Sequence, residues 1–267
     1  MRMDVPNNET PIETGLTGTV EKSIDLLFHL HGAGAPLGVS ALGRALGLPR
    51  STAHRLLAPL LRRGLVERDD SGRYRPGFAL VALGLGVLRD DPLVAAARPV
   101  LEAEAQELGE TVFLTAARGG RIAVLEKAEG RGFLRAAPQV GSTVPVHATA
   151  VGKLQLAHAP EAVRLEERLD AFTPSTRATP EALASEVELA RRRGFAENRD
   201  EWIPGLAVVA APVFVAGRMQ AAISIALPTV RLAELDPAQL GARAMRAAGR
   251  VARRLSGEQP VHDEAVA

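Results

Sequence analysis

The spacing of apolar residues divides the chain into two parts. Before residue 90 these residues recur with helical spacing, for example at Val20, Ile24, Leu27 and Phe28, which fall at i, i+4, i+7 and i+8. Beyond Asp91-Pro92, helical stretches alternate with short apolar runs typical of β-strands. The pattern predicts a small helical part followed by a larger part of mixed character.

Two short helices joined by a tight turn follow the first helix. We expect the first helix to end at Gly32 and the second to run from Ser40, its N-cap, to Leu46. Gly47 makes the turn, because glycine tolerates a positive φ. Pro49 suits the first position of a third helix, since an N–H would have no partner there. This spacing is typical of a helix-turn-helix.

The third helix has one apolar and one polar face. Gly43 of the preceding helix supplies the small side chain that a steep helix crossing needs, and Gly64 closes the third helix. Pro59 cannot donate to the carbonyl of Arg55, so we expect a kink or an early end there, with residues 49–57 intact. The apolar face comprises Ala53, Leu56, Leu57 and Leu60, and the opposite face Ser51, His54, Arg55 and Ala58.

A hairpin and an apolar helix complete the first part. Strands at 65–68 and 73–75 are expected to pair across the turn at 69–72, with Tyr74 on one face and Arg73 and Arg75 on the other. The helix predicted at 78–89 is apolar on more than one side and needs a partner surface to cover it.

The larger part is expected to have an α+β fold around an antiparallel sheet flanked by helices, because helices stand at both ends and neighbouring short strands lie between them. The predicted helices lie at 92–108, from about 148, at 180–193 and at 236–255, and the predicted strands at 111–117, 121–127, 132–136, 207–215 and 219–227.

Composition excludes several classes of protein. With 46% apolar and 24% charged residues, the chain resembles an ordinary globular protein. The absence of cysteine excludes a disulfide scaffold, a thiolate zinc site, an iron–sulfur cluster and a cysteine nucleophile. No apolar run reaches the roughly 18 residues of a membrane span, and the polar first twenty residues resemble no signal peptide. We expect a cytoplasmic protein with no membrane partner.

Positive charge is concentrated around the helix-turn-helix. The whole chain carries a net charge of +1, but residues 44–75 hold eight arginines against three acidic residues, a local charge of +5. These features together indicate binding to double-stranded DNA. The residues expected to face base edges are Arg50, Ser51, Thr52, His54 and Arg55, and those expected to neutralise phosphates are Arg62, Arg63, Arg68, Arg73 and Arg75.

Four separated blocks resemble the IclR family of bacterial transcription regulators, in the family's order. They are VSALGRALGLPRSTAHRLLAPLLRRGLVERDDSGRYRPG at 39–77, VPVHATAVGKLQLA at 144–157, RRRGFAENRDEWIPGLAVVAAPVF at 191–214 and AAISIALP at 221–228. The resemblance implies a winged helix-turn-helix, a linker helix that pairs subunits, and a GAF-like effector-binding domain. It also implies a homodimer or homotetramer on a palindromic operator.

We accordingly divide the chain by function. The expected segments are a disordered tail at 1–18, the winged helix-turn-helix at 19–77, the linker helix at 78–90, the effector-binding domain at 91–256 and a tail at 257–267.

The resemblance also implies a site for a small organic effector, which we expect to be a carboxylic acid. The segment from His147 to Lys153 precedes an apolar helical pattern, and a helix N-terminus attracts anions. Gly152-Lys153 lacks the remaining residues of a P-loop. The family's ligand-contacting positions, carried over by motif, are Leu134, Ala136, Ala150, Val151, Asn198, Leu206, Val208, Ser224 and Ala226.

This chain departs from better-known acid-binding members at three of these positions. Asn198 replaces an acid, Val208 a polar or thiol residue, and Ala226 a serine. A more apolar pocket follows, suited to an aromatic or branched acid. Taken singly, Leu206, Val208 and Ala226 are far more often sheet core than ligand contacts. Ser224 could equally bond a backbone carbonyl, and His147 could be either a buried histidine or an anion donor.

Two other classes of function compete with this hypothesis. An enzyme is disfavoured because neither the histidines nor the acidic residues form a recognisable catalytic or ligand-spaced group, so we expect no catalytic residue, metal or cofactor. An architectural DNA-binding protein would act without a ligand, and it would not need a second domain of over 160 residues. The operator, the effector and the sign of regulation stay open.

Overall fold

The structure is a computed structural model that describes residues 18–132 and 138–257. It consists of two compact units, Met1–Arg89 and Asp90–Ala267. Most of the strand predicted at 132–136, and all but one residue of each predicted tail, lie outside the described residues.

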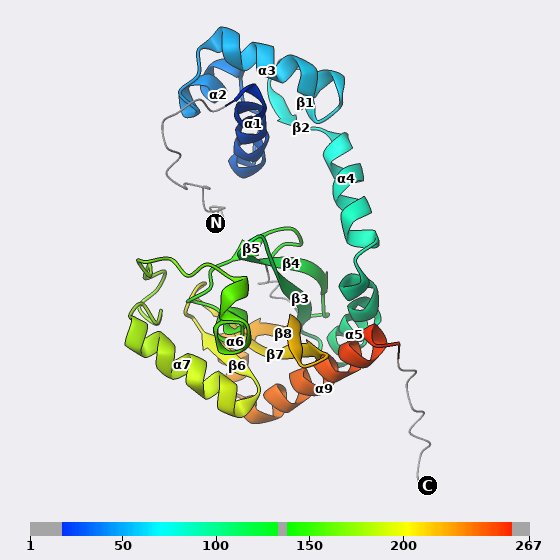
Figure 1. The fold of residues 1–267 in the computed structure, drawn as a ribbon, viewed down its shortest axis with the longest axis vertical. Helices are drawn as coiled ribbons and strands as arrows, with labels where there is room; N and C mark the ends of the chain where they lie inside the picture. The colour runs from blue at the N-terminus through cyan, green and yellow to red at the C-terminus, as the bar shows by residue number, and fades with distance from the viewer. Residues whose placement is uncertain (1–17, 133–137, 258–267) are drawn as a thin grey trace. The chain divides into compact units, whose positions relative to one another are not determined.

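The N-terminal unit packs three helices against a two-stranded hairpin. Its elements are α1 (Thr19–Ala33), α2 (Val39–Ala45), α3 (Arg50–Arg62), β1 (Val66–Arg68), β2 (Tyr74–Pro76) and α4 (Phe78–Arg89) (Figure 1). One apolar cluster holds the unit together, and its buried members are Leu26, Leu30, Leu42, Leu56, Leu57, Leu60, Val66 and Tyr74. The predicted hairpin is confirmed, with Tyr74 buried and the two flanking arginines exposed.

The turn between α2 and α3 depends on two glycines. Gly47 has a φ of +62°, which confirms the predicted left-handed turn. A Cβ on Gly43 would lie 2.7 Å from the carbonyl oxygen of Leu48, so the small side chain expected at the helix crossing is required. The predicted N-cap at Ser40 is wrong, because α2 begins after Gly38 and Ser40 lies within the helix.

Helix α1 extends further than the sequence predicted and carries two apolar faces. It ends at Ala33, one residue past the predicted end, and the cap residue Gly34 adopts the left-handed conformation. Leu26 and Leu30 are buried in the core, whereas Val20 and Phe28 of the predicted stripe are 70% and 66% exposed. The stripe that sequence periodicity identified is thus largely outside the core of the unit.

Pro59 does not end α3, so of the two outcomes expected there, a kink or an early end, the early end is wrong. The helix continues to Arg62, and the N–H of Arg63 donates to the Pro59 carbonyl at 3.1 Å. The proline ring lies on the exposed side, while Leu57 and Leu60 on either side of it are buried. Burial of these leucines offsets the one hydrogen bond that proline removes.

The C-terminal unit is built on a six-stranded sheet in the order β5-β4-β3-β8-β7-β6, with antiparallel neighbours throughout. This confirms the predicted α+β class. The strands are β3 (Thr111–Arg118), β4 (Arg121–Ala128), β5 (Thr143–Val144), β6 (Ala196–Arg199), β7 (Leu206–Val215) and β8 (Arg218–Pro228). The helices are α5 (Pro92–Leu108), α6 (Ala150–His158), the 3-10 turn η1 (Pro160–Ala162), α7 (Pro180–Arg193), α8 (Thr229–Leu232) and α9 (Pro237–Leu255).

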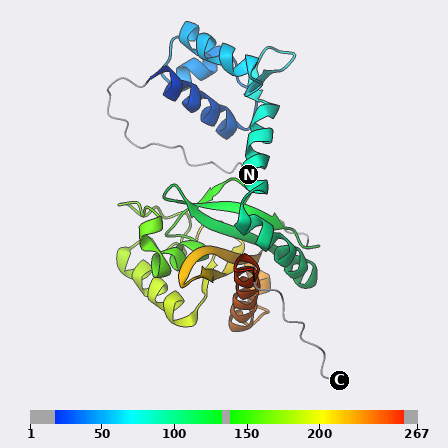
Figure 2. The same ribbon diagram turned by 45° about the vertical axis from the view of Figure 1, so that its right-hand side comes forward.

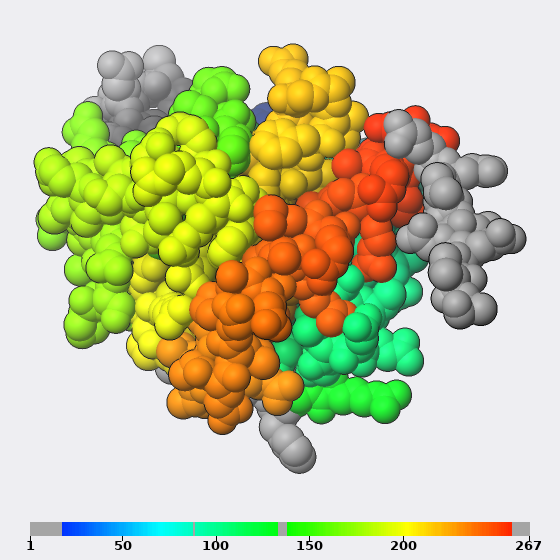
Figure 3. All heavy atoms as spheres, turned by 90° about the horizontal axis from the view of Figure 1, so that it is seen from below, coloured from blue at the N-terminus to red at the C-terminus, as the bar shows by residue number. Residues whose placement is uncertain are grey.

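Helices cover both faces of this sheet (Figure 2). Helices α5 and α9 pack side by side on one face, where Figure 3 shows α9 crossing the surface in orange and red. Buried Glu104 of α5 joins the pair by accepting hydrogen bonds from Arg243 and Arg250 of α9. Helix α6 packs on the opposite face, and α7 packs against α6.

Candidate nucleic-acid interface and apolar pocket

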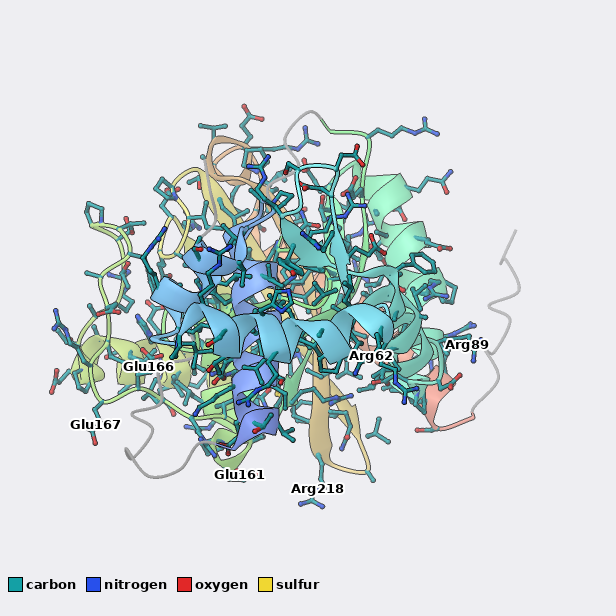
Figure 4. The ribbon with its side chains drawn as sticks, turned by 90° about the horizontal axis from the view of Figure 1, so that it is seen from above. Arg62, Arg89, Glu161, Glu166, Glu167 and Arg218 are labelled. Carbon is teal, nitrogen blue, oxygen red and sulfur yellow. The ribbon has the colours of Figure 1, made fainter. Side chains whose placement is uncertain are left out.

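The N-terminal half of α3 offers an open polar face, which Figure 4 views from above with Arg62 labelled at the end of the helix. Among the side chains expected to meet base edges, Thr52 is half-buried. The others are exposed, namely Arg50, Ser51, His54 and Arg55. Among the described residues, neither Arg50 nor Arg55 has an ion pair, and the same holds for Arg62 and Arg63. Their charges therefore face solvent.

The arginines of the hairpin have acidic partners. The Arg73 guanidinium lies 3.6 Å from Asp69 and donates to the Ser71 hydroxyl at 2.8 Å. Arg75 pairs with Glu67 at 3.1 Å. The Phe78 N–H and then Arg75 lower the pKa of Glu67, while hydrogen bonds from Ser71 and Arg73 lower the pKa of Asp69. Both carboxylates are thus charged at neutral pH, and the pairs are exposed enough to exchange with a phosphate.

Arg68 is attached to the hairpin differently. Its guanidinium lies 5.3 Å from the centroid of the Tyr74 ring, and Nε donates to the Gly72 carbonyl at 3.4 Å. Within the described part of the chain the α3 arginines thus have no acidic partner, whereas the arginines of the hairpin are held at defined positions.

A small apolar pocket lies in the C-terminal unit. Five of the nine residues predicted to contact an effector line it: Ala150, Val151, Asn198, Leu206 and Val208. The remaining lining residues are Phe113, Pro138, Val144, Thr149 and Trp202. The predominance of aliphatic and aromatic side chains agrees with the apolar character expected from the sequence.

The first turn of α6 forms the polar end of the pocket. Thr149 caps the helix by accepting from the Gly152 N–H at 3.2 Å, and its hydroxyl donates to the Pro145 carbonyl at 2.7 Å. The first N–H groups of a helix have no acceptor within it, and here they belong to Ala150 and Val151.

Asn198 adds a second polar group beside this helix start. The side chain is 2% exposed, and Nδ2 donates to the Ala148 carbonyl at 3.2 Å. This bond fixes the orientation of the amide, so Oδ1 is the remaining acceptor, and it has no partner among the described residues. The pocket thus combines helix N–H donors with one buried amide oxygen.

Two of the four other predicted contact residues, Ser224 and Ala226, are not among the described residues that line the pocket. Ser224 lies on β8 between Phe113 of β3 and Ala210 of β7, fully buried, and its hydroxyl has no partner in the described chain. Ala226 lies opposite Val208 in the apolar cluster on that face. Leu134 and Ala136 fall outside the described residues.

His147 proves to be a structural group in a buried position. It is 3% exposed, stacks on Phe172 with ring centroids 5.4 Å apart, and bonds the Asp170 carbonyl through Nε2 at 2.8 Å. Since a carbonyl only accepts, Nε2 carries a proton in this arrangement. The ring therefore connects the start of α6 to the loop around Asp170.

Sequence reasoning missed a buried ionic cluster next to the pocket. Lys153 of α6 contacts Glu186 of α7 and Glu201 in the turn before β7. Burial raises the pKa of Glu201, although the neighbouring Lys153 ammonium opposes that shift. A signal did exist, since the helical neighbours of Lys153 at i−3, i+3 and i+4, namely Ala150, Leu156 and Ala157, are apolar. A lysine buried on such a face needs a charged partner.

Two further features are absent from residues 18–132 and 138–257. None of the helices described is long and apolar enough to cross a bilayer. In the same residues no three His, Asp or Glu side chains come together as a metal site would require.

Both units of the chain match known protein families. Residues 85–253 match the family described as the bacterial transcriptional regulator IclR C-terminal domain, and residues 19–70 match the IclR helix-turn-helix domain. The chain is 32% identical over 228 residues to the HTH-type transcriptional regulator BhcR of Paracoccus denitrificans, covering 83% of this chain and 81% of that protein. It is 33% identical over 204 residues to the glycerol operon regulatory protein of Streptomyces coelicolor, covering 75% and 80%.

Solved structures have the same fold over most of the chain. The IclR protein of Thermotoga maritima aligns with a TM-score of 0.71 and 27% identity, over 89% of this chain and 98% of that one. An IclR homologue from Microbacterium hydrocarbonoxydans, solved in complex with 4-hydroxybenzoate, aligns with a TM-score of 0.77 and 25% identity, over 90% and 100%.

Proposed function

Because the chain belongs to the IclR family of bacterial transcription regulators, we propose that it reads an operator through α3 and senses a small organic acid in its pocket. It is a DNA-binding transcriptional regulator, as its relatives are named, and not an enzyme. Its partner is chromosomal DNA, which is why we expect it in the cytoplasm.

We propose separate roles for the basic residues of the N-terminal unit. Arg50, Ser51, Thr52, His54 and Arg55 contact base edges in the major groove, where an exposed helix start presents hydrogen-bond donors. Arg62, Arg73 and Arg75 contact phosphates and carry no sequence information. The free charge of the α3 arginines and the exposed, exchangeable pairs of the hairpin support this division.

We propose that the protein acts as a dimer or tetramer on a palindromic operator. Helix α4 exposes five large apolar side chains, namely Phe78, Val81, Leu83, Leu85 and Val87. Val20, Ile24 and Phe28 of α1 are exposed as well. A second copy would remove both surfaces from water and present two α3 helices about 34 Å apart, one turn of the duplex.

The same proposal assigns a role to each segment of the chain. Residues 19–77 bind DNA, residues 78–90 form the helix that pairs subunits, and residues 91–256 bind the effector. The division of the chain into two compact units falls after residue 89, within one residue of the boundary proposed after the linker helix.

The effector proposed here is an aromatic or branched carboxylic acid. The observation that carries it is the pocket itself, in which apolar walls surround the N-terminus of α6. Asn198 Oδ1, which has no partner among the described residues, can accept only from a donor elsewhere on the ligand, such as a hydroxyl. The carboxylate would accept from the first α6 N–H groups, and the apolar body would contact Phe113, Trp202 and Val208. A relative of the same fold binds an acid of this class, 4-hydroxybenzoate.

Operator binding with and without ligand tests the effector proposal. Fragments bound by the full chain are first selected from the host genome. Their affinity is then measured alone, with benzoate, 4-hydroxybenzoate or 3-methylbutanoate, and with benzamide as the uncharged control. We expect at least one acid to shift both the operator affinity and the melting temperature while benzamide does not. If no acid shifts either quantity, sensing of this class of compound is wrong while DNA binding stands.

A further inference from the structure

Lys153 is the one lysine in α6, and its side chain is completely buried. Its ammonium donates three hydrogen bonds: to Glu201 Oε1 at 2.7 Å, to Glu186 Oε2 at 2.9 Å and to the Glu197 carbonyl oxygen at 2.9 Å. An ammonium has three N–H groups, so every donor is used. A buried charge needs such complete pairing, and here three separate segments provide it.

Two of these three acceptor residues are sequence neighbours of residues that line the pocket. Glu197 immediately precedes Asn198, and Glu201 immediately precedes Trp202, and both following residues line the pocket. Lys153 itself belongs to the helix whose first turn forms the polar end of the same pocket. One cation therefore connects α6 to the segments that carry two further walls.

The cluster is not arranged for stability alone. Glu201 is 5% exposed, and its second oxygen, Oε2, has no partner in the described part of the chain. Apolar side chains would fill such a position without leaving a polar atom unpaired, and buried ion pairs are weak evidence for stability. What they provide is a fixed geometry, because the three acceptors converge on a single atom.

We propose that Lys153 is a positioning residue for the effector pocket, holding Asn198 and Trp202 in place through Glu197 and Glu201. It acts without touching the ligand, since it is not among the described residues that line the pocket. The inference rests on the proposed function only for the effect on ligand affinity. Its structural half, the position of Trp202, is testable without any ligand.

Trp202 makes this test direct because it is the only tryptophan in the chain. Its emission spectrum and its quenching by acrylamide report on one pocket wall in the full-length protein. We compare Lys153→Met, which removes the ammonium, with Glu201→Gln, which keeps the shape and removes the charge. The matched control is Glu188→Gln, an exposed α7 residue whose partners are arginines of its own helix.

We expect both cluster variants to shift Trp202 emission to longer wavelength and to increase quenching, while Glu188→Gln behaves as wild type. A double variant, Lys153→Met with Glu201→Gln, leaves no unpaired charge at Glu201, so it separates folding from positioning. It is expected to fold and still to show the altered emission. If the folded variants, including the double one, retain wild-type emission and quenching, the proposal is wrong.

Calorimetry with 4-hydroxybenzoate tests whether Lys153 also affects the affinity for the ligand. If the wild type binds this probe, Lys153→Met is expected to bind it about tenfold more weakly or worse, because small displacements of contact groups are costly. Altered Trp202 emission with unchanged affinity would overturn the link to the ligand. Absence of binding to the wild type would count against the choice of effector, and the emission result would still decide the role of Lys153.

Discussion

Replacing single arginines in the N-terminal unit should separate sequence reading from phosphate binding. Arg55 is exposed on α3 and has no ion pair within the described residues, so its donors are available to a base. Losing a good base contact costs about 1–3 kcal/mol of discrimination, or roughly 5- to 150-fold in affinity. Arg55→Ala should therefore weaken binding to a genomically selected fragment by this factor and leave binding to scrambled duplex almost unchanged.

Arg73→Ala should have a different effect. In the free protein this side chain is 57% exposed and already bound by Asp69 and Ser71, so a phosphate would only exchange one set of partners for another. The affinity loss should be modest and equal on all sequences. The slope of log affinity against log salt should become shallower by about 0.9, since one fewer counterion is released.

Fluorescence anisotropy of labelled duplexes over a series of salt concentrations measures both quantities for both variants. The reasoning would be refuted by equal losses on selected and scrambled DNA for Arg55→Ala. It would also be refuted by a loss confined to the selected fragment for Arg73→Ala.

Three further substitutions test the packing and the ionic clusters. Gly43→Ala should destabilise the N-terminal unit by about 1–3 kcal/mol and weaken DNA binding, because its Cβ would press on the Leu48 carbonyl; wild-type melting would contradict this. Glu104→Ala should lower the unfolding free energy of the C-terminal unit in urea by about 3 kcal/mol, since Arg243 and Arg250 lose their shared acceptor. Burial raises the pKa of Glu201, so its stabilising contribution is complete below the ordinary value of 4.5 and is lost as pH rises through the raised value. Glu201→Gln should flatten this part of the stability profile, and an unchanged slope would show that Glu201 titrates normally.

Elements with a strong single pattern were predictable from the sequence. Helices α4, α5 and α7 occupy the predicted residues. Pro92 and Pro180 mark the starts of α5 and α7, and the spacing of apolar residues predicts the remaining bounds. Strand β6 was missed because the residues AENR show no apolar alternation. Its place in the sheet comes from pairing with β7, a long-range contact that local pattern cannot reveal.

Tertiary packing accounts for the errors in the N-terminal unit. Local rules place a break at Pro59, yet α3 continues because Leu57 and Leu60 are buried on the far side of the proline. The α1 stripe shows the same limit. Periodicity identifies an apolar face, but only the structure shows that the core takes Leu26 and Leu30 and leaves Val20 outside.

The candidate pocket was only half predictable. Motif positions brought Ala150, Asn198 and Val208 to the same cavity, although they lie far apart in the sequence. Trp202 was not identified because nothing in the sequence shows which side of the turn after β6 faces inward. Lys153 was recognised only as failing the P-loop pattern, and its role depends on three acceptors from distant segments.

The central claim is that the full chain recognises a particular DNA sequence. The most direct measurement is its affinity, at physiological salt, for a duplex selected from the host genome and for the same bases in scrambled order. The selected duplex should bind at least about 10³-fold more tightly than the scrambled one. Equal affinity for the two duplexes, or no binding to either, would contradict it.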